Sequence, residues 1–136
     1  MPRVSKRTLS ETALRRIQGL LLDEFVRIDD KKEMAELFRK LMTESEKIML
    51  PKRLAAFVMV DKGIPDSRIC SSLFLTAETV SRYRMNYLTA KKKGNHIATI
   101  VQRVGFKQEM KVLLKEILRG YVIPALGGRI PRKGLF

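Results

Sequence analysis

Residues 63–88 read GIPDSRICSSLFLTAETVSRYRMNYL, and this stretch is the most informative one for the fold. Its spacing predicts two helices joined by a short turn at Phe74 and Leu75. Asp66 is a candidate cap for the first helix, and Thr76 is a candidate cap for the second. The first helix carries an apolar stripe formed by Ile69, Cys70 and Leu73.

The second of these helices is suited to reading DNA. A recognition helix enters the major groove with its N-terminal residues against base edges, and the cap at Thr76 leaves those side chains free to point outward. We expect Val80 to face the core, Glu78, Thr79 and Ser81 to carry base readout, and the lysines that follow to lie past the helix and meet the phosphate backbone. The predicted DNA-contacting residues are Thr76, Ala77, Glu78, Thr79, Ser81, Arg82, Arg84, Lys91, Lys92 and Lys93.

The charge of the chain agrees with a polyanionic partner. The 136 residues include 28 Lys and Arg against 14 Asp and Glu, which gives a net charge of +14. Between Glu78 and Glu109 there is no acidic residue, and the basic side chains of this interval begin on the predicted recognition helix. An excess of this kind favours nucleic acid or an anionic membrane surface, and its position favours phosphate contact.

The remaining sequence predicts an all-α fold. Residues 1–8 form a basic N-terminal arm, residues 9–120 form a single all-helical domain with the helix-turn-helix at about 64–90, and residues 121–136 form a basic tail rich in Gly and Pro. Capping-box spacing recurs at two predicted helix starts. The predicted helix starts and irregularities are caps at Thr8 with Glu11, at Asp29 or Asp30, at Thr43 with Glu46 and at Asn95, a kink at Pro51, and an interruption at Gly105.

The sequence lacks the residues that most enzymes and metal sites require. Cys70 and His96 are the only cysteine and histidine, too few for a zinc site of three or four such ligands. No nucleophile–base pair, paired carboxylates or phosphate-binding glycine loop is present in a supporting context. We therefore expect no enzymatic activity, no metal and no cofactor. No apolar run reaches the roughly 20 residues of a membrane span, which predicts a cytoplasmic protein without a membrane partner.

Three pieces of sequence, in order, carry a resemblance to a known family. They are LMTESE at 41–46, Leu50 followed three residues later by Arg53, and LFLTAETVSR at 73–82. The stretch 41–88 that holds them resembles the Trp repressor family of helix-turn-helix DNA-binding proteins, and covers about a third of the chain. The resemblance implies a transcriptional regulator that binds operator DNA as a homodimer, a helical bundle in which the N-terminal helices of two subunits interlock.

The resemblance also places a tryptophan pocket. It assigns ligand-contacting roles to Thr43, Arg53 and Arg82, and it aligns Asn86 with a Ser that contacts the amino group of the ligand. Tyr83 stands where the tryptophan-responsive members have Gly, so a phenol would fill the space of the indole. These two departures predict that free tryptophan does not act as a strong corepressor, and they argue against a small-molecule effector.

Two other functions fit the same sequence. One is an accessory DNA-binding protein of replication or transposition, and the other is a basic helical protein-interaction module without sequence-specific DNA binding. The salt dependence of binding to unrelated DNA separates a DNA binder from the second alternative. The resemblance does not explain the extension beyond residue 94, which could form a helical hairpin, more dimer surface or a further DNA contact.

Overall fold

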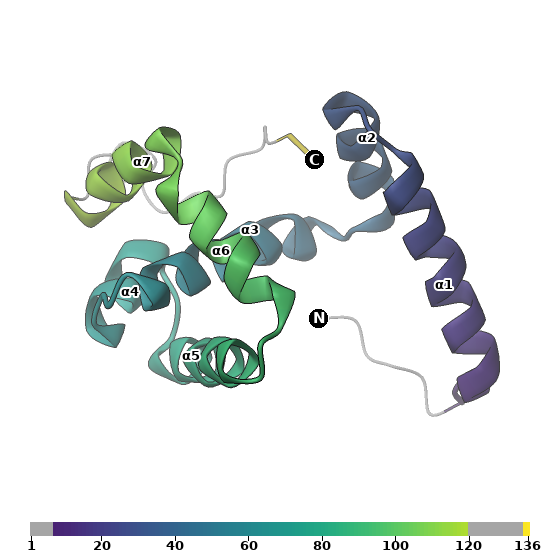
Figure 1. The fold of residues 1–136 in the computed structure, drawn as a ribbon, viewed down its shortest axis with the longest axis horizontal. Coiled ribbons are helices and arrows are strands. Elements are labelled where there is room, and N and C mark those ends of the chain that lie inside the picture. Colours follow the sequence, from purple (N-terminus) through teal and green to yellow (C-terminus); the bar gives the residue numbers. More distant parts are fainter. Residues whose placement is uncertain (1–6, 120–134) are drawn as a thin grey trace. The chain divides into compact units, whose positions relative to one another are not determined.

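The computed structural model describes residues 7–119 and 135–136, and in these residues every regular element is a helix. The predicted all-α class is therefore confirmed for the described residues, which contain no strand (Figure 1). The seven helices are α1 (Glu11–Arg27), α2 (Lys31–Leu41), α3 (Glu44–Asp61), α4 (Asp66–Leu73), α5 (Ala77–Lys92), α6 (His96–Phe106) and α7 (Gln108–Arg119).

The chain divides into two compact units, residues 1–47 with 133–136 and residues 48–132. The predicted single domain over 9–120 stays a prediction. Most of the predicted basic arm (1–6) and of the predicted tail (120–134) lies outside the described residues.

In the first unit, α1 and α2 meet through aromatic rings. The centroids of Phe25 and Phe38 lie 5.5 Å apart, and those of Phe38 and Phe136 lie 5.3 Å apart, both in edge-to-face geometry. Such pairs contribute about 0.5–1.5 kcal/mol beyond the area that they bury. Neither helix contains a fully buried residue, so these contacts cover only a part of their apolar faces.

The caps of these helices follow the sequence prediction with one correction. The sequence predicted Asp29 or Asp30 as the cap of α2. Asp30 is the cap, and its side chain accepts hydrogen bonds from the backbone at the start of the helix. The predicted capping box of Thr8 with Glu11 is wrong, because Ser10 is the cap of α1 and its Oγ accepts from the Ala13 amide at 3.1 Å. Ser10 stands directly before the first helical residue, which is the position that a capping side chain must occupy to reach the free amides.

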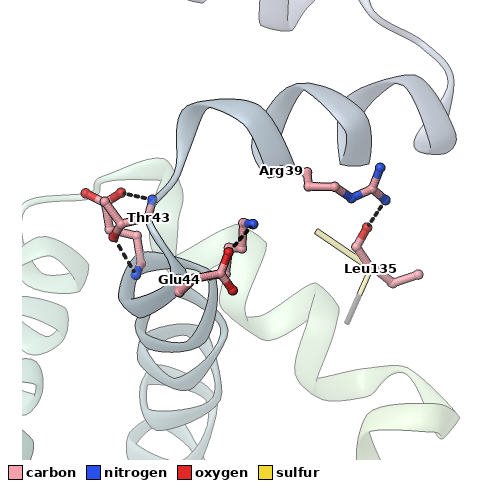
Figure 2. A network of polar contacts seen from close by, with 6 residues as sticks. Arg39, Thr43, Glu44 and Leu135 are labelled. Atoms are coloured by element: carbon pink, nitrogen blue, oxygen red, sulfur yellow. Dashed lines mark hydrogen bonds and ion pairs between the residues drawn. The ribbon is translucent and has the colours of Figure 1, made fainter. Parts of the chain in front are cut away.

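The predicted capping box at the start of α3 is confirmed. The Thr43 amide donates to Glu46 at 2.7 Å, and the Glu46 amide donates to Thr43 Oγ1 at 3.2 Å (Figure 2). Lys47 pairs with Glu44 at 2.8 Å, and Arg39 donates to the Leu135 carbonyl at 3.2 Å. The bonds of the capping box use backbone donors that a helix start leaves unpaired.

In the second unit, the helices from α3 through α7 share one hydrophobic core. The buried apolar residues are Ala56, Val58, Met59, Val60, Ile69, Leu73, Val80, Tyr83, Tyr87, Val101 and Leu114. α3 runs through Pro51 without a break, and the kink predicted there stays a prediction. It ends at Asp61, two residues before Gly63, whose φ of 77° is the left-handed conformation that glycine adopts without steric cost.

The segment after α5 forms two helices, α6 and α7. Asn95 Oδ1 accepts from the Ile97 amide at 2.9 Å, which confirms the predicted cap of α6. The predicted interruption at Gly105 is wrong, because the break comes at Lys107 and Gly105 lies buried inside α6. A Cβ at Gly105 would lie 3.4 Å from Val58 Cγ1, about van der Waals contact, so α6 and α3 lie close together at this point.

Candidate nucleic-acid interface

The helices α4 and α5 form the two helices and turn that the sequence predicts. α4 ends at Phe74, which has φ 55° and ψ 52°, and the Leu75 amide then donates to the Cys70 carbonyl at 3.1 Å. Phe74 is the one non-glycine residue with positive φ in the described part of the chain. A bulky residue in this left-handed conformation carries a strain cost, and the bond at Leu75 helps to hold the sharp turn. The predicted cap at Asp66 is wrong, since Pro65 is the cap residue and makes no side-chain bond.

Thr76 caps α5, as predicted. Its Oγ1 accepts from the Thr79 amide at 3.2 Å and its hydroxyl donates to Thr79 Oγ1 at 2.8 Å. Both hydroxyls are therefore engaged with each other, and the Thr79 side chain is half-buried. Thr76 and Thr79 thus position the start of α5, and the predicted base readout by Thr79 stays a prediction.

The two faces of α5 differ in burial. Val80, Tyr83 and Tyr87 are buried in the core of the second unit, as predicted for Val80. The exposed residues lie on the remaining surface at helical spacing. They are Ala77, Glu78, Ser81, Arg82, Met85, Asn86, Leu88, Thr89, Lys91 and Lys92. Because one face of α5 is buried and the other exposed, the outward face presents Glu78, Ser81 and Arg82 in the first two turns.

Arg84 is engaged within the protein. Its Nε and Nη2 both lie 2.6 Å from Asp66 Oδ1, and Nη2 also donates to the Ile64 carbonyl at 3.2 Å. These bonds tie the middle of α5 to the start of α4. The predicted DNA contact of Arg84 stays a prediction, and the bonds to Asp66 and Ile64 are partners that the spacing in sequence did not indicate.

Lys91 is also paired within the protein. Its Nζ lies 2.9 Å from Asp61 Oδ1, and the Tyr87 hydroxyl donates to the same oxygen at 2.6 Å. Partial burial raises the pKa of Asp61, but the bonds from Tyr87 and Lys91 outweigh it and hold that pKa below 3.8. Burial, together with the Asp61 carboxylate, raises the pKa of the Tyr87 phenol above its ordinary value of 10.0. The phenol therefore stays protonated and joins α5 to the end of α3.

The sequence predicted that all three lysines lie past the recognition helix, and this is wrong for Lys91 and Lys92. Lys91 and Lys92 occupy the last turn of α5, and Lys93 is its C-terminal cap. Helical propensity extends α5 through them, because lysine is a good helix former and cations stabilise a helix C-terminus. Gly94, with φ 73°, ends the helix instead.

Two of the four residues that the resemblance assigns to a ligand pocket have other partners here, and the other two are exposed. The Arg53 guanidinium carbon lies 5.3 Å from the centroid of the buried Tyr83 ring, a cation–π distance. Thr43 is part of the capping box of α3 and belongs to the first unit, whereas Arg53 belongs to the second. Arg82 and Asn86 are exposed on α5. Tyr83 also packs edge-to-face against Phe57, with centroids 6.1 Å apart.

The exposure of two apolar side chains, one at the turn and one on α5, was not predicted from the sequence. Met85 is 64% exposed on the outward face of α5, and Phe74 is 60% exposed at the turn. Met85 follows Ser81 and Arg82 at helical spacing, which is the pattern that could have identified it. Apolar side chains in this position are suited to contact with thymine methyl groups.

No family model, no curated protein and no solved structure matches this chain. In the described residues, no helix is long and apolar enough to cross a membrane.

Proposed function

We propose that the chain is a sequence-specific, DNA-binding transcriptional regulator of the Trp repressor type, located in the cytoplasm, which binds operator DNA as a homodimer through α4 and α5. The observation that carries this proposal is the division of α5 into a buried face and an outward face that begins at the Thr76 cap. The outward face presents Glu78, Ser81 and Arg82, residue types that pair with base edges in the major groove.

The net charge of +14 supports the same function. Phosphate neutralisation by Lys and Arg supplies much of the affinity of proteins for DNA. Lys92 and Lys93 are exposed at the end of α5 and have no ion-pair partner among the described residues, whereas Lys91 is held by Asp61. Lys92 and Lys93 are therefore the cations of this group that are free to meet phosphate.

The two roles predict two different mutant signatures. Replacing Glu78, Ser81 or Arg82 by Ala should reduce discrimination between a selected and a scrambled duplex, by about 1–3 kcal/mol for each side chain that pairs with a base edge. Replacing Lys92 and Lys93 by Gln should weaken binding to both duplexes alike. The slope of log affinity against log salt concentration should become flatter by about 0.9 for each phosphate that is no longer neutralised. The measurement is affinity against salt concentration for both duplexes, with the site selected from a random pool.

A matched control is the Lys31→Gln, Lys32→Gln variant, which removes the same charge from α2 and should bind as wild type does. If the lysine variant at 92 and 93 loses discrimination while the three Ala variants keep it, the roles are reversed. If the wild type binds selected and scrambled duplexes equally, sequence-specific regulation is excluded, and an accessory DNA-binding protein of replication or transposition becomes the better description. If it binds neither, the chain is a protein-interaction module.

Dimerisation is proposed from the apolar face of α1. Leu14, Ile17 and Leu21 are 44%, 52% and 38% exposed, although their spacing places them on one face of the helix. Soluble proteins rarely leave contiguous apolar faces in water, so a second copy of the chain is the proposed cover.

Free tryptophan is not expected to be an effector. The Tyr83 ring is buried, packs against Phe57 and lies within cation–π distance of Arg53. By the resemblance, a side chain at this position takes the space that an indole would need. Isothermal titration calorimetry with tryptophan should give no saturable heat at about millimolar ligand. A dissociation constant in that range corresponds to a binding free energy of about −4 kcal/mol. Saturable binding that a Tyr83→Gly change weakens would contradict this view of the pocket, and binding that appears only in Tyr83→Gly would support it.

A further inference from the structure

The segment that the resemblance leaves unexplained carries a regular row of cations. Lys107, Lys111, Lys115 and Arg119 follow one another at intervals of four residues, and all four are exposed. Lys107 lies immediately before α7 and the other three lie on it. We call these four residues the α7 cation row.

The α7 cation row occupies one flank of its helix. An α-helix turns about 100° per residue, so four-residue steps advance each cation by only about 40° around the axis. Met110, Leu114, Ile117 and Leu118 form the face that packs into the core. Lys111, Lys115 and Arg119 lie to one side of this face, and Lys107 stands before the helix at its edge. Glu109 and Glu116 fall on the opposite side, about 100° beyond the core face in the other direction. Glu116 stands three residues before Arg119, about 60° away around the axis, so the acidic side adjoins the C-terminal end of the row without an ion pair to it.

The charges of the row are not neutralised within the described part of the chain. Lys107, Lys115 and Arg119 form no ion pair there, and Lys111 lies 6.0 Å from the exposed Phe106 ring in a cation–π contact. Cations four residues apart on a helix repel each other, so the row costs stability in the free protein. An anionic partner with regularly spaced charges offsets that cost.

The position of α7 favours DNA as this partner. α4 contacts both α5 and α7, and the three helices belong to the same unit (Figure 1). In helix-turn-helix complexes the helix that precedes the recognition helix crosses the DNA backbone. The contact of α7 with α4 is the reason for choosing DNA as the partner, since α7 packs against the helix that would cross the backbone.

We propose that the α7 cation row is a second DNA-contacting surface, which binds the phosphate backbone outside the base pairs that α5 reads. This inference rests on the proposed function of α4 and α5. It gives the extension a role in affinity and footprint length and none in base readout, because phosphate contacts carry no sequence information directly.

The test uses the full chain and the triple variant Lys107→Gln, Lys115→Gln, Arg119→Gln, which leaves the Lys111–Phe106 contact intact. Two duplexes are compared, one holding the selected site alone and one extended at each end by about ten base pairs, one helical turn. On the extended duplex the triple variant should bind at least about tenfold more weakly at moderate salt, with a salt slope flatter by about two to three units. On the short duplex it should match wild type.

Two controls separate this effect from net charge. The variant Lys31→Gln, Lys32→Gln, Lys40→Gln removes the same three charges from α2 and should bind both duplexes as wild type does. The variant Glu109→Gln, Glu116→Gln neutralises the opposite flank of α7 and should leave the salt slope on the extended duplex unchanged. Circular dichroism should give the same helix content for all three variants as for wild type.

Three results would overturn the inference: a triple variant that matches wild type on the extended duplex, equal weakening of the triple variant and the α2 control, or loss of binding to phosphatidylserine vesicles with DNA affinity unchanged. The last result would assign the row to a membrane surface. Failure of the proposed function has a different signature, in which wild type binds selected and scrambled sites equally well.

Discussion

Replacing Val80 by Asp is expected to unfold residues 48–119. Val80 has no exposed surface, and its side chain lies in the core that joins α5 to the other helices of the second unit. Burying a carboxylate without a partner costs several kcal/mol, which is comparable with the roughly 5–15 kcal/mol that stabilises a typical domain. Thermal and guanidinium unfolding followed by circular dichroism should show loss of the cooperative transition or a large fall in its midpoint.

The neighbouring residue supplies the control for this prediction. Ser81 is exposed on the same helix, so Ser81→Asp adds the same carboxylate one position away and should change stability by no more than about 0.5 kcal/mol. Equal unfolding midpoints for the two variants would contradict the assignment of Val80 to the buried face of α5. Such a result would also remove the structural basis for an outward, DNA-reading face.

A comparably large effect is expected in the first unit. Replacing Leu21 or Phe25 by Asp should yield aggregated or unfolded protein, because the proposed dimer buries the apolar face of α1 on which both residues lie. The carboxylate would be left unpaired at the interface, at a cost of several kcal/mol. Light scattering and circular dichroism of the purified variants measure assembly and helix content together.

Thr12 provides the matched control in α1. It is exposed on the side of the helix away from this face, so Thr12→Asp should dimerise as wild type does. Two results would contradict the proposed dimer. One is a well-folded, soluble monomer from the wild-type sequence. The other is a Leu21→Asp variant with the same mass and helix content as wild type.

The helical class and most of the helix starts could be predicted from local sequence. Thr43 with Glu46, Thr76 and Asn95 were predicted as caps, and each makes the expected bond to a backbone amide. These predictions succeed because a cap acts over two or three residues, so the interaction is contained in the local sequence. The period of apolar residues also predicted that Val80 faces the core.

Which cations on α5 are free depends on the packing of distant segments. Arg84 and Lys91 look like Arg82 and Lys92 in sequence, but Asp66 and Asp61 hold the first two in ion pairs across 18 and 30 residues. No local pattern encodes these partners, because they meet only when α3 and α4 pack against α5.

The break between α6 and α7 also follows from packing and not from local preference. Glycine is a poor helix former, so local propensity placed the interruption at Gly105. In the folded unit Gly105 is buried in α6, and a Cβ there would stand 3.4 Å from Val58 Cγ1, about van der Waals contact. Burial of Val101 and Gly105 in the unit thus outweighs the intrinsic preference of glycine, and the chain turns at Lys107 instead.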